Sequence, residues 1–339
     1  MYELKFSEDV CARCKTYDCL MKCQYMNFDL EKAKEEKWKL IRGEDTSILK
    51  DCVTCYACEE YCPYNNHPFY QIVEQQEKLG YHPAPKPLEQ SQVIAMKPKG
   101  TIKHKDLKDP VMNMCYFPMM VGAIKGKLFQ DISMVVGSDI FCNLVYLHFA
   151  RQSVIKERLP KMIDNIMTHY MKPNNLTTLI LYHDECFGTY NHWAPAFGID
   201  VPFKTVHFFD YLYNRLLELK SDINPLNLKV AYQRPCSNRL CPETDKFTDD
   251  IFGLIGVERV KREYDYENAL CCGAVLEAQQ RFDQAEELRK NNISDMKSAG
   301  VTHCVFNCPF CFWTLAEPVM KAGIAPIMMS DLCQQALAK

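Results

Sequence analysis

The C-terminal third of the chain contains three cysteine-bearing stretches, LKVAYQRPC (228–236), ENALCCG (267–273) and VTHCVFNCPFC (301–311). Apart from Cys304, they supply five cysteines in three short clusters: Cys236, Cys271, Cys272, Cys308 and Cys311. Each cluster follows a run typical of a β-strand, and the ends of parallel strands meet at one edge of a sheet. We therefore expect the five thiols to converge. Soft thiolates suit iron and its sulfides, so the pattern indicates an iron–sulfur centre. A structural zinc site or buried free thiols is the alternative.

This pattern, one cysteine, then Cys-Cys-Gly, then C-x-x-C, resembles the cysteine-rich CCG domain of the B-type subunit of heterodisulfide reductase and its relatives. Those relatives include the D-type subunit of heterodisulfide reductase, the iron–sulfur subunits of glycolate and lactate oxidation, and that of anaerobic glycerol-3-phosphate dehydrogenase. The resemblance implies that the five cysteines hold a noncubane [4Fe–4S] cluster close to the substrate. It also implies that they are the catalytic residues.

The N-terminal 62 residues carry eight further cysteines, the last four within CVTCYACEEYCP (52–63). This run has the C-x-x-C-x-x-C-x-x-x-C-P form of bacterial ferredoxins. Its first three cysteines, Cys52, Cys55 and Cys58, wrap one cubane. The fourth, Cys62, ordinarily ligates the other cluster of a two-cluster domain. Zinc is disfavoured here, because it takes four ligands that typically come as two separated pairs.

A partner run precedes it, with Cys11, Cys14, Cys19 and Cys23 in a C-x-x-C-x4-C-x-x-x-C pattern. It departs from the ferredoxin form by two extra residues before Cys19 and by Gln24 in place of proline. Crossed ligation gives one [4Fe–4S] cubane to Cys11, Cys14, Cys19 and Cys62, and the other to Cys52, Cys55, Cys58 and Cys23. The D-type subunit of the resembled family joins such a domain to a CCG domain, and this chain resembles that fusion over nearly its whole length.

The sequence divides into four segments. Residues 1–80 form the expected two-cluster ferredoxin-like domain, with a solvated Glu/Lys-rich helix in DLEKAKEEKWKL (29–40) and a second helix from Pro68 to about Gly80. Residues 81–110 are proline- and lysine-rich, including KPKGTIKHKDLK (97–108), which predicts an extended linker. Residues 111–220 and 221–339 are two α/β halves. The predicted fold class is therefore α+β overall, with a small, mainly helical domain followed by a duplicated parallel-sheet CCG domain.

The two halves show an internal duplication. Cys115, Cys142, His183, Cys186 and Asp210 correspond to Cys236, Cys272, Cys308, Cys311 and Asp331, at offsets between 121 and 130 positions. Each half alternates β-type runs with helical ones such as 147–167 and 274–296, which predicts parallel strands with right-handed crossovers.

The first half lacks part of the ligand set. Phe141-Cys142-Asn143 stands where the second half has Cys-Cys-Gly, and His183 stands where it has Cys308. Four candidate metal ligands remain: Cys115, Cys142, His183 and Cys186. Three cysteines and a histidine suit tetrahedral zinc and could also hold a cubane. An empty, vestigial site with buried thiols is equally open. The other cysteines, Cys241, Cys304 and Cys333, are expected to be buried as small apolar groups.

Composition narrows the function classes. The formal net charge is −3, which argues against nucleic acid as the main partner. The chain opens with a polar stretch rather than a secretory signal, so a cysteine-rich protein of a reducing cytoplasm is expected. No apolar run reaches the roughly 20 residues of a spanning helix, so any membrane association would be peripheral, through partners.

These features predict a redox subunit of an oxidoreductase complex. Electrons would pass from the two cubanes to the noncubane cluster, at which a disulfide is reduced to thiols, as in heterodisulfide reductase. The sequence shows no G-x-G-x-x-G fingerprint after a strand, so a flavin-containing, hydrogenase or dehydrogenase partner would supply such cofactors. The alternative is an electron-transfer subunit without a substrate of its own, serving a flavin- or quinone-dependent partner. A zinc-stabilised interaction protein is disfavoured by the ferredoxin run.

Overall fold

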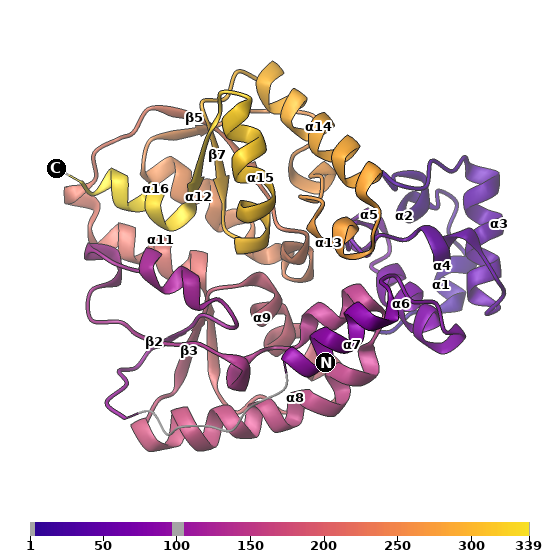
Figure 1. Ribbon diagram of the computed structural model, residues 1–339, viewed down its shortest axis with the longest axis horizontal. Helices are drawn as coiled ribbons and strands as arrows, with labels where there is room; N and C mark the ends of the chain where they lie inside the picture. Colours follow the sequence, from indigo (N-terminus) through magenta and orange to yellow (C-terminus); the bar gives the residue numbers. More distant parts are fainter. Residues whose placement is uncertain (1–3, 97–104, 339) are drawn as a thin grey trace.

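The computed structural model describes residues 4–96 and 105–338. A helical N-terminal part lies at one end of the molecule, and two α/β halves lie beside each other next to it (Figure 1). The predicted α+β organisation, a mainly helical part followed by a duplicated parallel-sheet part, is confirmed.

Short helices build the N-terminal part. Their bounds are α1 (Glu8–Ala12), α2 (Asp18–Met21), α3 (Leu30–Ile41), α4 (Ser47–Asp51), α5 (Ala57–Tyr61), α6 (Pro68–Leu79) and α7 (Lys86–Ala95). A small core forms between them, where Leu20, Ala33, Leu40 and Ile48 are almost fully buried. The helix predicted to begin at Pro68 is present as α6, and Gly80 ends it in the left-handed conformation that favours glycine.

The first half contains a four-stranded parallel sheet in the order β2-β1-β3-β4. Its elements are β1 (Val111–Asn113), β2 (Ser133–Val135), α8 (Gln152–Ile166), β3 (Thr178–Leu181), α9 (Asp184–Gly188), α10 (Ala194–Ala196), β4 (Lys204–His207) and α11 (Phe208–Glu218). Pairing in register joins Val111 of β1 to Leu179 of β3. These two central strands are nearly fully buried apolar runs, as a sheet covered on both faces requires.

The second half repeats this arrangement in the order β6-β5-β7-β8. Its elements are β5 (Leu228–Gln233), α12 (Lys246–Leu254), β6 (Val257–Arg259), α13 (Ala274–Ala278), α14 (Phe282–Ser298), β7 (His303–Phe306), α15 (Pro309–Lys321), β8 (Ala325–Met328) and α16 (Met329–Ala336). Counting strands from each start, both sheets have the order 2-1-3-4, with every neighbouring pair parallel.

The duplication extends to single residues. Strand β7 begins and ends 125 positions after β3, the same offset that relates His183 to Cys308. Asn143 and Gly273, which follow the paired cysteine positions, both have a left-handed backbone, with φ of 67° and 95°. Asn and Gly are the residues that adopt this conformation most readily. Both halves therefore make the same turn, with different side chains on it.

The carboxyl ends of the central strands meet between the halves. Asn307, just after β7, donates a hydrogen bond from Nδ2 to the carbonyl oxygen of Tyr182, just after β3, at 3.4 Å. Tyr182 and Asn307 are equivalent positions of the duplication. The residues next in sequence are His183 and Cys308, so the strand ends that carry the predicted ligands face one another.

One local expectation was wrong, and another holds only in part. The segment 81–110 was expected to be extended, but it contains α7, because Pro87 occupies the first turn, where proline has no hydrogen bond to lose. The stretch 97–104, which includes much of the lysine-rich run, lies outside the described residues. Helix α3 is present where it was expected, and its Lys34 and Glu35 are exposed, but Glu36 and Lys37 are only 3% and 1% exposed. Both find polar partners inside the N-terminal part: Thr46 and Ser47 donate to Glu36, and Lys37 donates to Gln71.

Within residues 4–96 and 105–338, the helices are too short or too polar to cross a bilayer.

Candidate iron–sulfur and metal sites

One enclosed cavity in the N-terminal part is lined by Cys11, Cys14, Cys19 and Cys62. Asn66 anchors its rim, donating from Nδ2 to the Cys11 sulfur and from its backbone N–H to the Cys62 sulfur, each at 3.4 Å. Backbone and amide donors aimed at cysteine sulfurs are a hallmark of iron–sulfur sites, where they stabilise the negative charge of the bound cluster. These residues fit a cubane.

A second cavity is lined by Cys23, Cys52, Cys55, Cys58 and also Cys19. The loop around it is held in an unusual conformation. Thr54 and Tyr56, which flank Cys55, have φ of 55° and 64°. Residues other than glycine rarely adopt this left-handed backbone conformation, and such strain concentrates at functional sites. One result is that the Thr54 N–H reaches the Cys52 sulfur at 3.4 Å.

Several of the cysteine thiols that line these two cavities have raised pKa values, as expected for metal ligands in the absence of the metal. Burial raises the pKa of Cys19, Cys52 and Cys55 to about 12 each. Thiols with such pKa values are protonated at neutral pH unless a cation stabilises the thiolate. Iron can do so here, because it compensates for the lost hydration of the charged sulfur.

The five C-terminal cysteines are brought together. Their side chains touch in the order Cys236, Cys271, Cys272, Cys311 and Cys308. The Gly273 N–H donates to the Cys271 sulfur at 3.4 Å. Gly273 can turn its N–H inward because it has φ of 95°, and a Cβ there would crowd Arg289 and Ala285. The Cys-Cys-Gly sequence thus fits a site for adjacent thiolates, and its donor supports a cluster here too.

His183 does not lie with Cys115, Cys142 and Cys186, the other predicted metal ligands of the first half. Its side chain contacts Cys308 of the other half, and its ring packs edge-on against Phe117, with centroids 5.3 Å apart. A hydrogen bond from Cys311 lowers the pKa of Cys308 to about 5; burial opposes this lowering and His183 adds to it. Burial by itself would lower the pKa of His183, but Cys308 and then Glu185 outweigh it and raise that pKa to about 10. The imidazole therefore acts on the five-cysteine site.

The remaining first-half cysteines form a separate group. The sulfur atoms of Cys115, Cys142 and Cys186 all lie within 4.8 Å of one another, and all three residues are buried. The structure thus brings together three of the four predicted metal ligands and leaves His183 outside the group.

A buried polar series that the sequence did not reveal connects the sites. The Glu185 carboxylate lies 3.8 Å from His183 Nδ1 and 3.8 Å from His148 Nε2. His148 Nδ1 lies 3.1 Å from the Thr54 hydroxyl, inside the ferredoxin run. Burial raises the pKa of Glu185 to about 8 and lowers that of His148 to about 4. Glu185 directly precedes a candidate ligand, but nothing in the sequence pairs it with His148.

The ferredoxin run also docks on the second half through charge. Glu60 accepts two hydrogen bonds from Arg234, at 2.6 and 2.9 Å, and one from Arg239 at 3.0 Å. Both arginines are nearly fully buried and flank Cys236 in sequence. Arg239 also donates to the carbonyl oxygens of Glu267 and Ala269, just before Cys271. This network fixes the position of the second cavity relative to the five cysteines.

Asp184, His207 and Cys241 form another buried group that the sequence did not suggest. His207 Nδ1 accepts the Phe209 N–H at 3.2 Å, so its proton lies on Nε2, which faces Asp184 Oδ1 at 3.1 Å. A protonated Nε2 has no lone pair for a metal. The group is therefore a hydrogen-bonded cluster that holds the start of α9 in place. Cys304 and Cys333 are buried, as expected.

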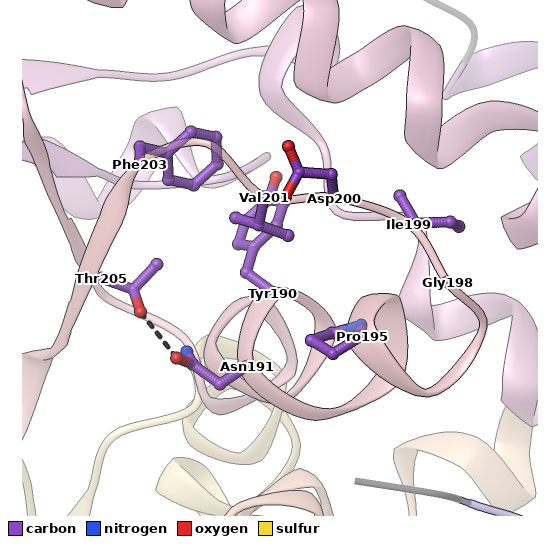
Figure 2. A pocket seen from close by; sticks show the side chains of 9 residues that line it. All are labelled: Tyr190, Asn191, Pro195, Gly198, Ile199, Asp200, Val201, Phe203 and Thr205. Carbon is purple, nitrogen blue, oxygen red and sulfur yellow. Dashed lines mark hydrogen bonds between the residues drawn. The ribbon is translucent and has the colours of Figure 1, made fainter. Parts of the chain in front are cut away.

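A surface hollow near β4 is separate from these sites (Figure 2). Its lining includes Tyr190, Pro195 and Phe203, and Thr205 donates to Asn191 at 2.8 Å beside it. None of the described residues that line it is a cysteine or histidine.

Comparison with known proteins agrees with this picture. Residues 230–316 match the family model described as a cysteine-rich domain, CCG, a span that contains all five C-terminal cysteines. In fold, the chain is similar to the crystal structure of a hypothetical protein from Helicobacter pylori, with a TM-score of 0.56 and 13% sequence identity. The match covers 95% of this chain and 66% of that one. The chain therefore spans about two thirds of the length of the protein it resembles, and the likeness concerns the fold alone.

Proposed function

We propose that this protein is the iron–sulfur subunit of an oxidoreductase complex, similar to the D-type subunit of heterodisulfide reductase. Two [4Fe–4S] cubanes would be held by Cys11, Cys14, Cys19 and Cys62 and by Cys23, Cys52, Cys55 and Cys58. Cys236, Cys271, Cys272, Cys308 and Cys311 would hold a noncubane [4Fe–4S] cluster. Its substrate would be a disulfide. The CCG match and the convergence of the five thiols support this assignment.

The observation that carries the proposal is the closeness of the second cavity to the five cysteines. Burial, and then the charges of Cys55 and Cys271, raise the pKa of Tyr25 well above its ordinary value, so its hydroxyl lies near both groups. Next to it, Gln24 donates to the Asn268 carbonyl oxygen at 2.7 Å, and Tyr61 donates to that of Glu267 at 3.0 Å. Such an arrangement suits transfer of single electrons from the ferredoxin run to the CCG run.

Reducing a disulfide to two thiols consumes two electrons and two protons. Bound clusters would supply the electrons one at a time, received from a flavin-containing, hydrogenase or dehydrogenase partner. The chain's own residues would hold the clusters, bury them from water and direct N–H groups at their sulfur ligands. His183 would donate to the Cys308 sulfur, on which negative charge increases during reduction.

A second candidate is an electron-transfer subunit with no substrate of its own, linked to a flavin- or quinone-dependent partner. It is favoured by the incomplete first half, where Phe141 and His183 replace cysteines. Two five-cysteine sites could each take one sulfur of a cleaved disulfide, but a single site must take them in sequence. The two candidates differ in whether a thiol binds the C-terminal cluster.

Replacing Cys272 tests both candidates. In the Cys272→Ser protein, purified anaerobically, we expect the reduced signals of two cubanes to remain, because their ligands are unchanged. A thiol-sensitive signal of the oxidised C-terminal cluster should be present in the parent protein and absent from the variant, because serine is a poor ligand for iron–sulfide.

Cys304→Ser is the matched control, since Cys304 is equally buried in β7 but contacts none of the five thiols in the described structure. Its spectrum should equal that of the parent. An unchanged spectrum in Cys272→Ser would refute the cluster assignment. A cluster that is lost in this variant, but never responds to thiols in the parent, would favour the electron-transfer subunit.

A further inference from the structure

We propose that Phe117, Phe310 and Trp313, here called the aromatic patch, bind an uncharged aromatic group of a small disulfide whose sulfurs react at the five-cysteine site. The inference rests on the proposed function and deepens it, because it names the chemical class of the substrate. Phe310 lies between Cys308 and Cys311 in sequence, but none of the three aromatic residues belongs to the cysteine pattern.

Ring contacts connect the surface of the molecule to the five-cysteine site. The Phe310 and Trp313 rings meet edge-on, with centroids 5.5 Å apart, and the two residues are 45% and 46% exposed. Phe117, from the first half, is buried against them, with its centroid 5.6 Å from that of Phe310 and 6.4 Å from that of Trp313. The Phe117 ring also contacts His183, which contacts Cys308. Along this row, only Phe117 and His183 separate the exposed rings from a cysteine of the site.

The duplication shows that this exposed surface is particular to one side of the interface between the halves. At the offsets that relate the halves, Trp313 is equivalent to Gly188, and Leu240 is equivalent to Met119. Gly188 and Leu240 pack together: a Cβ at position 188 would lie 2.8 Å from the Leu240 Cβ, and Leu240 is 5% exposed. Trp313 and Met119 are instead 46% and 56% exposed. One of two equivalent positions is therefore closed by protein, and the other presents large apolar side chains to solvent.

The chemistry of the aromatic patch suits an apolar group that is attached to sulfur. None of its three side chains carries a charge, and aromatic rings attract both other rings and sulfur atoms. Exposed apolar surface beside a reactive site marks a place where a ligand binds. Three rings match one aromatic group of a small molecule, whereas a protein partner typically covers about 800 Å².

The position of the patch also fits the reaction of the proposed function. The organic groups of a disulfide are bonded directly to its sulfurs, so a group held on the patch keeps a sulfur atom close to the five cysteines. Reduction breaks the sulfur–sulfur bond and forms two thiols. It consumes two protons and two electrons, which the partner of the proposed complex supplies. The patch would take no part in these steps and would select which disulfide undergoes them.

Comparing two disulfides tests the proposal. The full chain, purified anaerobically with its clusters, would reduce dibenzyl disulfide and bis(2-hydroxyethyl) disulfide with a reduced viologen as electron donor. We expect kcat/KM to be at least about tenfold higher for the benzyl compound, because its rings leave water for the patch. Trp313→Ala should lower this preference about tenfold, and Trp313→Phe should restore most of it, because a phenyl ring still offers an aromatic contact.

Phe282→Ala is the matched control. Phe282 is 60% exposed on α14 and has no ring contact with the aromatic patch among the described residues, so its replacement should keep the preference of the parent protein. Equal kcat/KM values for the two disulfides in the parent would overturn the proposal. So would a preference for the benzyl compound that persists undiminished in Trp313→Ala.

A second measurement needs no reduction. Equilibrium dialysis with benzyl 2-hydroxyethyl sulfide, a thioether without a sulfur–sulfur bond, should show binding to the parent and about tenfold weaker binding to Trp313→Ala. If the thioether binds in this way but neither disulfide is reduced, the proposed function is refuted and the apolar binding site is supported. If both disulfides are reduced equally well and the thioether does not bind, the proposed function is supported and the aromatic patch is refuted.

Discussion

His183 shows how one substitution changes the role of a position. In the second half the equivalent residue is Cys308, and the two side chains meet where the strand ends face each other. A histidine there can donate to the sulfur that it contacts, and hydrogen bonds to sulfur help to set the potential of an iron–sulfur cluster. The sequence correctly marks this position as special, but it cannot show which half the imidazole serves.

We expect His183→Ala to lower the reduction potential of the proposed C-terminal cluster by tens of millivolts, because donors to sulfur stabilise the more negative, reduced state. The potentials of the two proposed cubanes should not change. Redox titration followed by electron paramagnetic resonance would measure all three. His303→Ala, at the opposite end of β7, is the control and should leave every potential unchanged. A raised or unchanged potential in His183→Ala would show that the imidazole does not donate to Cys308.

At the scale of single elements, helix α3 illustrates a buried charge that sequence periodicity misses. Charged residues follow each other through LEKAKEEKWKLI (30–41), and this composition predicts a solvated helix. Glu36 nevertheless lies inside, where it accepts from the Thr46 hydroxyl at 2.6 Å and from the Ser47 N–H and hydroxyl at 2.8 Å. It thereby anchors the start of α4 to α3. Burial opposes ionisation, but these hydrogen bonds hold the pKa of Glu36 well below its usual range.

Replacing this carboxylate should destabilise the protein. Glu36→Gln keeps the size of the side chain but loses the charge that several donors share, so we expect a loss of about 1–3 kcal/mol. Glu35→Gln is the matched control on the same helix. Glu35 is exposed and pairs only with Lys39 among the described residues, so its replacement should leave the free energy of unfolding nearly unchanged. Chemical denaturation at neutral pH would compare the two. Equal effects would mean that the buried network adds no stability.

The elements themselves were mostly predictable, because their signals are local. Apolar runs before Cys236 and Cys308 correctly predicted the ends of β5 and β7, and Pro68 and Gly80 marked a helix that the structure contains. The strand expected before Cys271 and Cys272 was wrong, because β6 ends at Arg259 and the residues just before these cysteines lie in a loop. Helix α7 was missed because proline was interpreted only as favouring extended chain. Periodicity identifies which residues form a helix, but burial of Glu36 depends on Thr46 and Ser47, which belong to a different element.

At the scale of the whole molecule, the duplication was visible in sequence because matching cysteines recur at similar offsets. How the parts pack could not be read in this way. The Glu185–His148–Thr54 series joins the first half to the ferredoxin run, and its members lie as much as 131 positions apart. Contacts of this kind depend on how finished domains meet, and they leave no local pattern in a single sequence.

We expect electron transfer from the N-terminal part to the second half to depend strongly on Glu60. It belongs to the ferredoxin run, between Cys58 and Cys62, while Arg234 and Arg239 belong to the stretch around Cys236. Removing one member of a buried ion network leaves the others uncompensated and costs about 3–5 kcal/mol. Here the same change would also loosen the contact that sets the distance between the second cavity and the five cysteines.

We therefore predict that Glu60→Gln is less stable to denaturant and passes electrons more slowly from the proposed cubanes to the proposed C-terminal cluster, although all three clusters assemble. Rapid-freeze paramagnetic resonance after mixing with a reductant would follow the transfer. The control is Glu317→Gln, which removes an exposed pair with Lys321 on α15 and should alter neither stability nor rate. Normal transfer in a destabilised Glu60→Gln protein would limit the network to a structural role. A slowed transfer with intact clusters would show that the contact between Glu60 and the two arginines controls the rate of transfer by setting this distance.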